Sequence, residues 1–164
     1  MRPEDDPSWH RYPETILEFY RRPDDPEPIV CVDLRRPVPE EVRARLAEVG
    51  FDGAFGVVTA AAPVGEPQAD SFDRAREADL EQEVRTGAHA FAMRVDGVSP
   101  DGEHRERSVA VKLPRAEVVE LARDFGQSAI FWYDGADFWL VGALVDVEAR
   151  RLPDTDRTSA RRTA

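Results

Sequence analysis

Hydrophobic residues follow two different spacings along this chain. They alternate with other residues over 88–95 and 106–113, which predicts two β-strands joined by a hairpin loop at 99–104. In the second strand Val109 and Val111 share the apolar face, and Glu106 and Ser108 lie on the polar face. Short apolar runs predict four more strands, at 29–34, 55–61, 129–133 and 137–145.

Helical spacing occurs in four segments, 14–22, 39–49, 71–86 and 115–125. Pro39 suits the first turn of its helix, and Gly50 follows the end of that helix. Gly126 stands where a left-handed cap would end the last helix, so Gln127 is expected at a helix-to-strand junction.

From residue 55 onward the predicted order is strand, helix, strand, strand, helix, strand, strand. This order is typical of a split βαβ arrangement. We therefore predict an α/β (α+β) fold with a single, mostly antiparallel mixed sheet of five or six strands and packed helices. Residues 1–12 are predicted to be a flexible segment, 13–149 one domain, and 150–164 a disordered basic tail.

The charge of the chain excludes one class of function. The net charge is −11, and the last segment, Arg150–Ala164, carries five arginines and two aspartates, so the rest of the chain carries −14. Such a body repels nucleic acid and anionic lipid and attracts basic proteins. We predict no nucleic-acid or membrane partner, a possible basic protein partner, and a possible homo-oligomer through the aromatic residues of 131–139.

Catalytic and metal-binding motifs are missing from the sequence. The three histidines have no metal-type spacing, and no phosphate-binding glycine motif occurs, so neither a metal nor a cofactor is predicted. Cys31 is the single cysteine and is expected as a buried strand thiol. With no signal-peptide pattern at the N-terminus, it favours a cytoplasmic protein.

One set of polar residues is a candidate site. Thr59 ends the central apolar strand, Glu106 and Ser108 share a strand face, and Gln127 follows the capped helix, so all four are expected to approach one crevice. Each also has an ordinary structural explanation. Thr59 is a common strand residue, Glu106 could pair with Arg94, Ser108 could face solvent, and Gln127 could cap backbone groups.

The same residues carry a family resemblance. Thr59-Ala60-Ala61-Ala62-Pro63, Glu106-Arg107-Ser108 and Phe125-Gly126-Gln127-Ser128-Ala129-Ile130-Phe131 stand in that order in the chain. With these motifs the chain resembles a bacterial family, the domain of unknown function 3293, over about residues 50–135. The family pattern has asparagine where Ala62 stands and a second one near Asp73. The resemblance implies a compact α/β domain and no particular reaction.

Besides a purely structural oligomer subunit, two functions remain open on the sequence alone. The first, which the charge favours, is a non-catalytic protein-interaction module of a small acidic protein. The alternative is a small-molecule or nucleotide-derivative site, binding or hydrolytic, built from Thr59, Glu106, Ser108 and Gln127. In the alternative Glu106 acts as a base or a metal ligand, and Ser108 and Gln127 orient the substrate.

Overall fold

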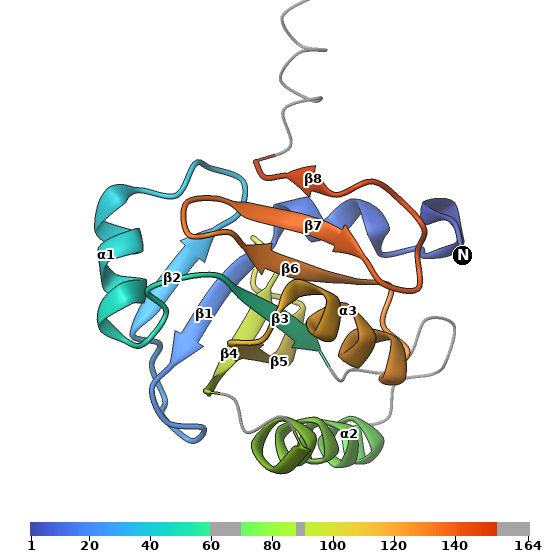
Figure 1. Cartoon of the computed structure of the whole chain (residues 1–164), viewed down its shortest axis with the longest axis horizontal. Helices are drawn as coiled ribbons and strands as arrows, with labels where there is room; N and C mark the ends of the chain where they lie inside the picture. The colour runs from blue at the N-terminus through green and yellow to red at the C-terminus, as the bar shows by residue number, and fades with distance from the viewer. Residues whose placement is uncertain (60–69, 88–90, 154–164) are drawn as a thin grey trace, which may run out of the picture.

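One antiparallel sheet forms the centre of the molecule (Figure 1). The computed structural model describes residues 1–59, 70–87 and 91–153. Within these residues the sheet has eight strands in the order β2-β1-β4-β5-β3-β6-β7-β8, and neighbouring strands are antiparallel. The strands are β1 (Ile16–Tyr20), β2 (Val30–Asp33), β3 (Phe55–Thr59), β4 (Ala92–Val98), β5 (Arg105–Val111), β6 (Ala129–Tyr133), β7 (Phe138–Gly142) and β8 (Arg150–Arg151).

The centre of the sheet has the split order expected from the sequence. Strand β5 lies between β3 and β4, and β3 lies between β5 and β6. The prediction of five or six strands in a mixed sheet was wrong. The described strands number eight and all of their pairings are antiparallel. Of the two additional strands, β1 lies between β2 and β4, and β8 extends the sheet at the edge beside β7.

Residues 14–22 were predicted as a helix, but Ile16–Tyr20 form strand β1. Leu17 and Phe19 alternate with polar or outward residues, and both are buried. The segment pairs with β2 on one side and β4 on the other. Two partner strands satisfy its backbone hydrogen bonds, which a helix of this length would satisfy only in part.

The sheet is strongly curled, and each of its two faces packs against a different hydrophobic core. In Figure 1 the strands β1 and β2 run at a steep angle to β6 and β7. The inner, concave face holds one core, which includes Leu17, Val57 and Leu140. The outer face holds a second core, which includes Val109 and Ile130. Alternate residues of each central strand therefore enter one core or the other.

Three α-helices cover this sheet in the described part of the chain. Helix α1 (Glu40–Glu48) adds Leu46 to the inner core. Helices α2 (Asp70–Gln82) and α3 (Arg115–Asp124) lie on the outer face (Figure 1), where Leu80 and Val118 enter the outer core together with Val84, which follows α2. The short π-helix η3 (Glu83–Gly87) continues α2. The predicted boundaries of α1 and α3 hold to within one residue.

Both ends of the described chain contain regular secondary structure. Residues 1–12 include the 3-10 helix η1 (Pro3–Asp5) and most of η2 (Trp9–Glu14), and Trp9 and Tyr12 pack against the inner core. At the other end β8 pairs with β7 and Leu152 is buried, so the ordered chain extends past residue 149. Residues 154–164 lie outside the described residues.

Cys31 was expected to be buried, and it is exposed. Val30 and Val32 point into the inner core from the edge strand β2, so the alternation of side chains turns Cys31 outward. No described helix has the length and apolar composition that crossing a membrane requires.

Candidate functional site

A cavity of about 540 Å³ opens on the concave face of the sheet. All four residues predicted from the sequence, Thr59, Glu106, Ser108 and Gln127, line it. They come from β3, from β5 and from the junction between α3 and β6, so the fold brings together residues that are far apart in the chain. Its volume lies within the range of about 300–1,000 Å³ that is common for small-molecule sites.

The register of two central strands places three of these side chains. Thr59 lies directly opposite Ser108 in the pairing of β3 with β5. Glu106 lies two residues before Ser108 and therefore on the same face of the sheet. Ser108 is only 6% exposed, whereas Glu106 is exposed at the mouth of the cavity. The polar face of β5 is thus directed into a cavity and not into bulk solvent.

The hydrogen bonds from two cavity hydroxyls to backbone carbonyls are long. The Ser108 hydroxyl donates to the backbone carbonyl of Glu106 at 3.5 Å, and the Thr59 hydroxyl donates to that of Arg107 at 3.4 Å. Hydrogen bonds between oxygens normally measure about 2.7–2.8 Å. These long contacts leave the Ser108 hydroxyl able to form a shorter bond with a molecule inside the cavity.

Gln127 reaches the cavity because of the way α3 ends. Gly126 has a φ of +69°, as the sequence predicted for a left-handed cap. The backbone N–H of Gly126 donates to the carbonyl of Arg123, and that of Gln127 donates to the carbonyl of Ala122. These two bonds form a Schellman motif, which turns the chain from the helix into β6.

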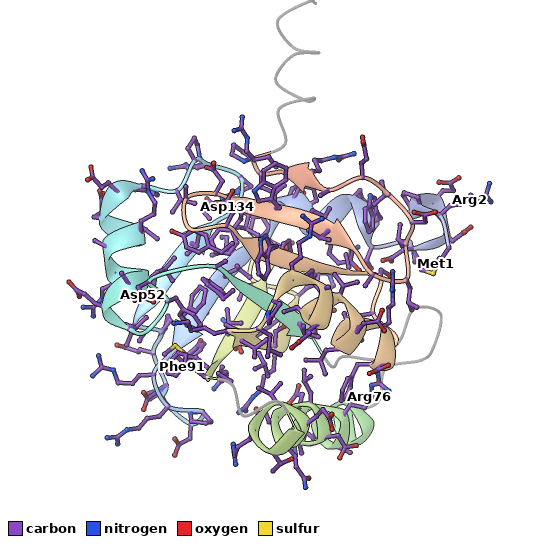
Figure 2. The ribbon with its side chains drawn as sticks, in the orientation of Figure 1. Met1, Arg2, Asp52, Arg76, Phe91 and Asp134 are labelled. Atoms are coloured by element: carbon purple, nitrogen blue, oxygen red, sulfur yellow. The ribbon has the colours of Figure 1, made fainter. Side chains whose placement is uncertain are left out.

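The side chain of Gln127 also has a structural role. Its Nε2 donates to the Phe125 carbonyl at 3.0 Å, and the residue is 7% exposed. The same carbonyl accepts a hydrogen bond from Arg76, which extends from α2 toward α3 (Figure 2). The capping role that the sequence left open for Gln127 is therefore present, together with its place in the cavity wall.

The N-terminal segment forms a cavity wall that the sequence analysis missed. Tyr12 donates its hydroxyl to Oδ2 of Asp6 at 2.7 Å, and the backbone N–H of Ser8 donates to Oδ1 of Asp6 at 2.8 Å. The Tyr12 ring packs edge-on against Phe131 of β6, with 6.4 Å between ring centroids. These contacts hold residues 8–15 across the concave face, where several of them line the cavity.

The environment of the Tyr12 hydroxyl is electrostatically negative. Burial raises the pKa of Tyr12 most, and the carboxylates of Asp6 and Glu106 raise this pKa further. Asp6 is itself 5% exposed and lies behind the Tyr12 hydroxyl. The wall of the cavity therefore carries negative charge both at its mouth and behind its tyrosine.

Apolar side chains form the inner end of the cavity. Leu17, Val57 and Leu140 are buried members of the inner core, and Phe131 packs against them. The cavity thus offers hydroxyl, amide and carboxylate groups near one end and hydrocarbon at the other. Among the described residues no group of three or more acidic, histidine or cysteine side chains is arranged to hold a metal ion.

Glu106 does not pair with Arg94, which the sequence analysis considered. Glu106 lies opposite Gly97, whereas Arg94 lies opposite Val109 on the other face of the sheet. There Arg94 binds the buried carboxylate of Asp96, with Nη2 2.8 Å from Oδ2. The alternation of β5 therefore separates an ion-pair cluster on the outer face from the cavity on the inner face.

The comparison with known families covers the same region of the chain. Residues 58–130 match the family model described as Protein of unknown function (DUF3293). Over these residues the chain is similar to this family. The matched region contains Thr59, Glu106, Ser108 and Gln127, whereas the wall formed by residues 8–15 lies before it. No curated protein and no solved structure matches the chain.

Two parts of the family pattern lie outside the residues that the structure describes. Ala60 to Pro63 of the first motif lie outside the described residues, and so does the side chain of Asp73. The Glu106-Arg107-Ser108 motif lies in β5. The Phe125–Phe131 motif comprises the C-terminal cap of α3 and the first part of β6. The two motifs that the structure describes in full both contribute side chains to the cavity.

Proposed function

We propose that the DUF3293 region forms a binding site for a small organic molecule in the concave cavity. The observation that supports this most strongly is the convergence of Thr59, Glu106, Ser108 and Gln127 on one cavity of about 540 Å³. An apolar part of the ligand packs against Leu140 and Phe131, and a polar part meets the hydroxyl, amide and carboxylate groups.

Each polar residue has a distinct role in this proposal. The Ser108 hydroxyl replaces its long bond to a backbone carbonyl with a shorter bond to the ligand, and Thr59 lies opposite it in the cavity wall. Glu106 accepts hydrogen bonds at the mouth. Gln127 is held by its bond to Phe125 and presents a fixed amide to the ligand. A hydrolytic role for Glu106 as a base is the catalytic version of the same proposal.

Two variants that each remove one hydroxyl group, Tyr12→Phe and Ser108→Ala, test whether Ser108 belongs to a binding site or stabilises the fold. Tyr12→Phe removes a hydroxyl bonded at 2.7 Å to the buried carboxylate of Asp6, and we expect a loss of about 1.5 kcal/mol. That loss corresponds to a decrease in Tm of about 3–6 °C. Ser108→Ala removes a hydroxyl whose bond is 3.5 Å long, and we expect an unchanged or higher Tm.

The measurement is thermal unfolding of both variants and the wild type by circular dichroism in one buffer. Gln127→Ala serves as an internal reference, because it removes the 3.0 Å bond to the Phe125 carbonyl and should lower Tm. A decrease for Ser108→Ala as large as that for Tyr12→Phe would assign Ser108 to the scaffold and count against the proposed site.

The acidic surface supports a second proposal, the non-catalytic interaction module. The net charge of −11 favours a basic protein partner, and binding of this kind weakens steeply as salt is added. The basic partner, a homo-oligomer and the cytoplasmic location all stay predictions from the sequence. We place the cavity first because it combines a volume, a polar end and an apolar end at one location.

A further inference from the structure

The N-terminal wall of the cavity, residues 1–14, is held differently from the walls that the sheet forms. We call these residues the strap. Thr59 and Ser108 lie on strands that pair with each other and with further strands on both sides. The strap contains no strand and consists of η1, η2 and the residues around them. This inference rests on the proposed function, because it concerns how a molecule reaches the same cavity.

The backbone of the strap is tied to the rest of the molecule at its two ends. At one end the backbone N–H of Asp146, in the loop after β7, donates to the Met1 carbonyl at 2.9 Å. At the other end the chain enters β1, which pairs with strands on both sides. Between these ends the described backbone bonds of the strap join residues three apart, such as Trp9 and Asp6. Bonds of this local kind can break without disturbing the sheet.

Side-chain contacts hold the middle of the strap against the sheet. The Tyr12 hydroxyl donates to Asp6 at 2.7 Å. The Tyr12 ring packs edge-on between Trp9 and Phe131, with 5.5 and 6.4 Å between ring centroids. Asp6 is buried, whereas the other residues of the strap are half-buried or exposed. The closed position therefore depends on two aromatic contacts and on a hydrogen bond to a carboxylate, and not on a large buried apolar surface.

The burial of the Asp6 carboxylate lowers the cost of opening the strap. In the closed strap this carboxylate accepts from the Tyr12 hydroxyl and from the backbone N–H of Ser8, and these donors take the place of water. A carboxylate loses hydration when it is buried. When the strap lifts, Asp6 regains that hydration, which offsets part of the lost contacts.

We propose that the strap opens and closes the cavity, turning where it joins β1, with the Tyr12–Asp6 hydrogen bond as its latch. Ser108 and Gln127 line the cavity but are only 6% and 7% exposed, so little of either is accessible while the strap is closed. Opening admits a molecule to these groups, and closing shields the bound molecule from water. The strap precedes residues 58–130, so the region that matches the family model supplies the polar groups and the strap controls access to them.

Thiol labelling in the full chain measures this access without a ligand. Ser108→Cys places a thiol in the cavity wall, and Cys31→Ser removes the exposed native thiol. Iodoacetamide, a small neutral reagent, alkylates the introduced thiol while the strap is open, and mass spectrometry follows the reaction at neutral pH. Adding Tyr12→Phe should raise the labelling rate about tenfold, because a hydrogen bond to a charged group contributes about that factor.

Hydrogen exchange of the chain with its native Ser108 is the second measurement, and it does not depend on how the thiol variant folds. The backbone N–H groups of Trp9 and Arg11 donate to carbonyls within the strap. We expect these two amides to exchange faster than those of β5, and Tyr12→Phe to speed their exchange about tenfold. Tyr20→Phe is the matched control, because it removes a hydroxyl bonded at 3.1 Å to Glu18 in β1 and should change neither strap exchange nor labelling.

The possible outcomes separate this inference from the proposed function. Faster labelling and faster strap exchange in Tyr12→Phe, with no change in Tyr20→Phe, support the latch. The inference is overturned if the strap amides exchange together with those of β5, if Tyr12→Phe leaves either rate unchanged, or if Tyr20→Phe raises both rates equally. The strap is then a fixed wall, and the cavity remains a candidate site. The proposed function itself fails only if a chemically diverse fragment set does not bind in the cavity.

Discussion

Gly56→Ala is expected to lower the free energy of unfolding by about 3 kcal/mol and Tm by about 6–12 °C. Gly56 lies on the outer face of the central strand β3, directly under α3. A β-carbon at this position would lie 3.0 Å from Cγ2 and 3.1 Å from Cβ of Val118, and closer still to Cγ1. Val118 is fully buried in the outer core, so its side chain has little room to move.

The control for this prediction is Gly53→Ala, because nothing lies within 4 Å of a β-carbon added at Gly53. Urea unfolding of the two variants should show a much lower midpoint for Gly56→Ala only. The double variant Gly56→Ala, Val118→Ala should be more stable than the sum of the two single losses predicts, since the smaller side chain accepts the added methyl. Equal midpoints for Gly53→Ala and Gly56→Ala would contradict the close approach of α3 to β3.

The second large effect is expected for Asp96→Asn, which should cost about 3 kcal/mol. Asp96 is 1% exposed and accepts from two arginines. Arg94 donates from Nε and Nη2 at 3.0 and 2.8 Å, and Arg105 donates from Nη1 at 2.9 Å. Asparagine removes the negative charge and points an NH₂ donor at guanidinium donors, which leaves the Arg94 charge without its partner.

Asp52→Asn is a suitable comparison, because Asp52 is an exposed carboxylate that also binds a cation. Its Oδ1 lies 3.1 Å from Nζ of Lys112, and its side chain is 75% exposed. Exposed ion pairs contribute little to stability, so the unfolding midpoint of Asp52→Asn should stay near that of the wild type. If Asp96→Asn unfolds at the same urea concentration as Asp52→Asn, the Asp96 cluster does not stabilise the fold as described.

The local rules of the sequence were sufficient for the helix ends and for much of the central topology. Pro39 and Gly50 mark α1, and Gly126 caps α3 with a positive φ, as expected. These signals depend on residues that are adjacent in the chain. The split order of β3, β4, β5 and β6 also followed, because alternating helices and strands permit few arrangements.

The same rules failed where the structure depends on contacts between distant residues. Five residues from Ile16 to Tyr20 fit a helical or an extended pattern equally well, and only their pairing with β2 and β4 decides between them. The face of β5 that carries Ser108 was expected to be polar. It is largely buried because the sheet curls, and curvature is not encoded in the alternation of one strand.

The candidate site was predicted in part. Thr59, Glu106, Ser108 and Gln127 were selected from their positions at strand ends and on one strand face, and the structure brings them to one cavity. The wall formed by the N-terminal segment was missed, because proline-rich polar residues are typical of loose termini. A buried aspartate and a tyrosine six residues apart hold this segment in place, which only the folded structure reveals.

The most direct test of the central claim is an NMR fragment screen on the ¹⁵N-labelled wild type and on Thr59→Phe. The phenylalanine adds bulk to a half-buried position in the cavity wall, at the end of β3. We predict fragments that shift the amides of β3, β5 and Gln127 in the wild type and lose this effect in Thr59→Phe, while the variant still unfolds cooperatively. Binding that persists in a folded Thr59→Phe, or fragments that shift only amides far from the cavity, would contradict the account.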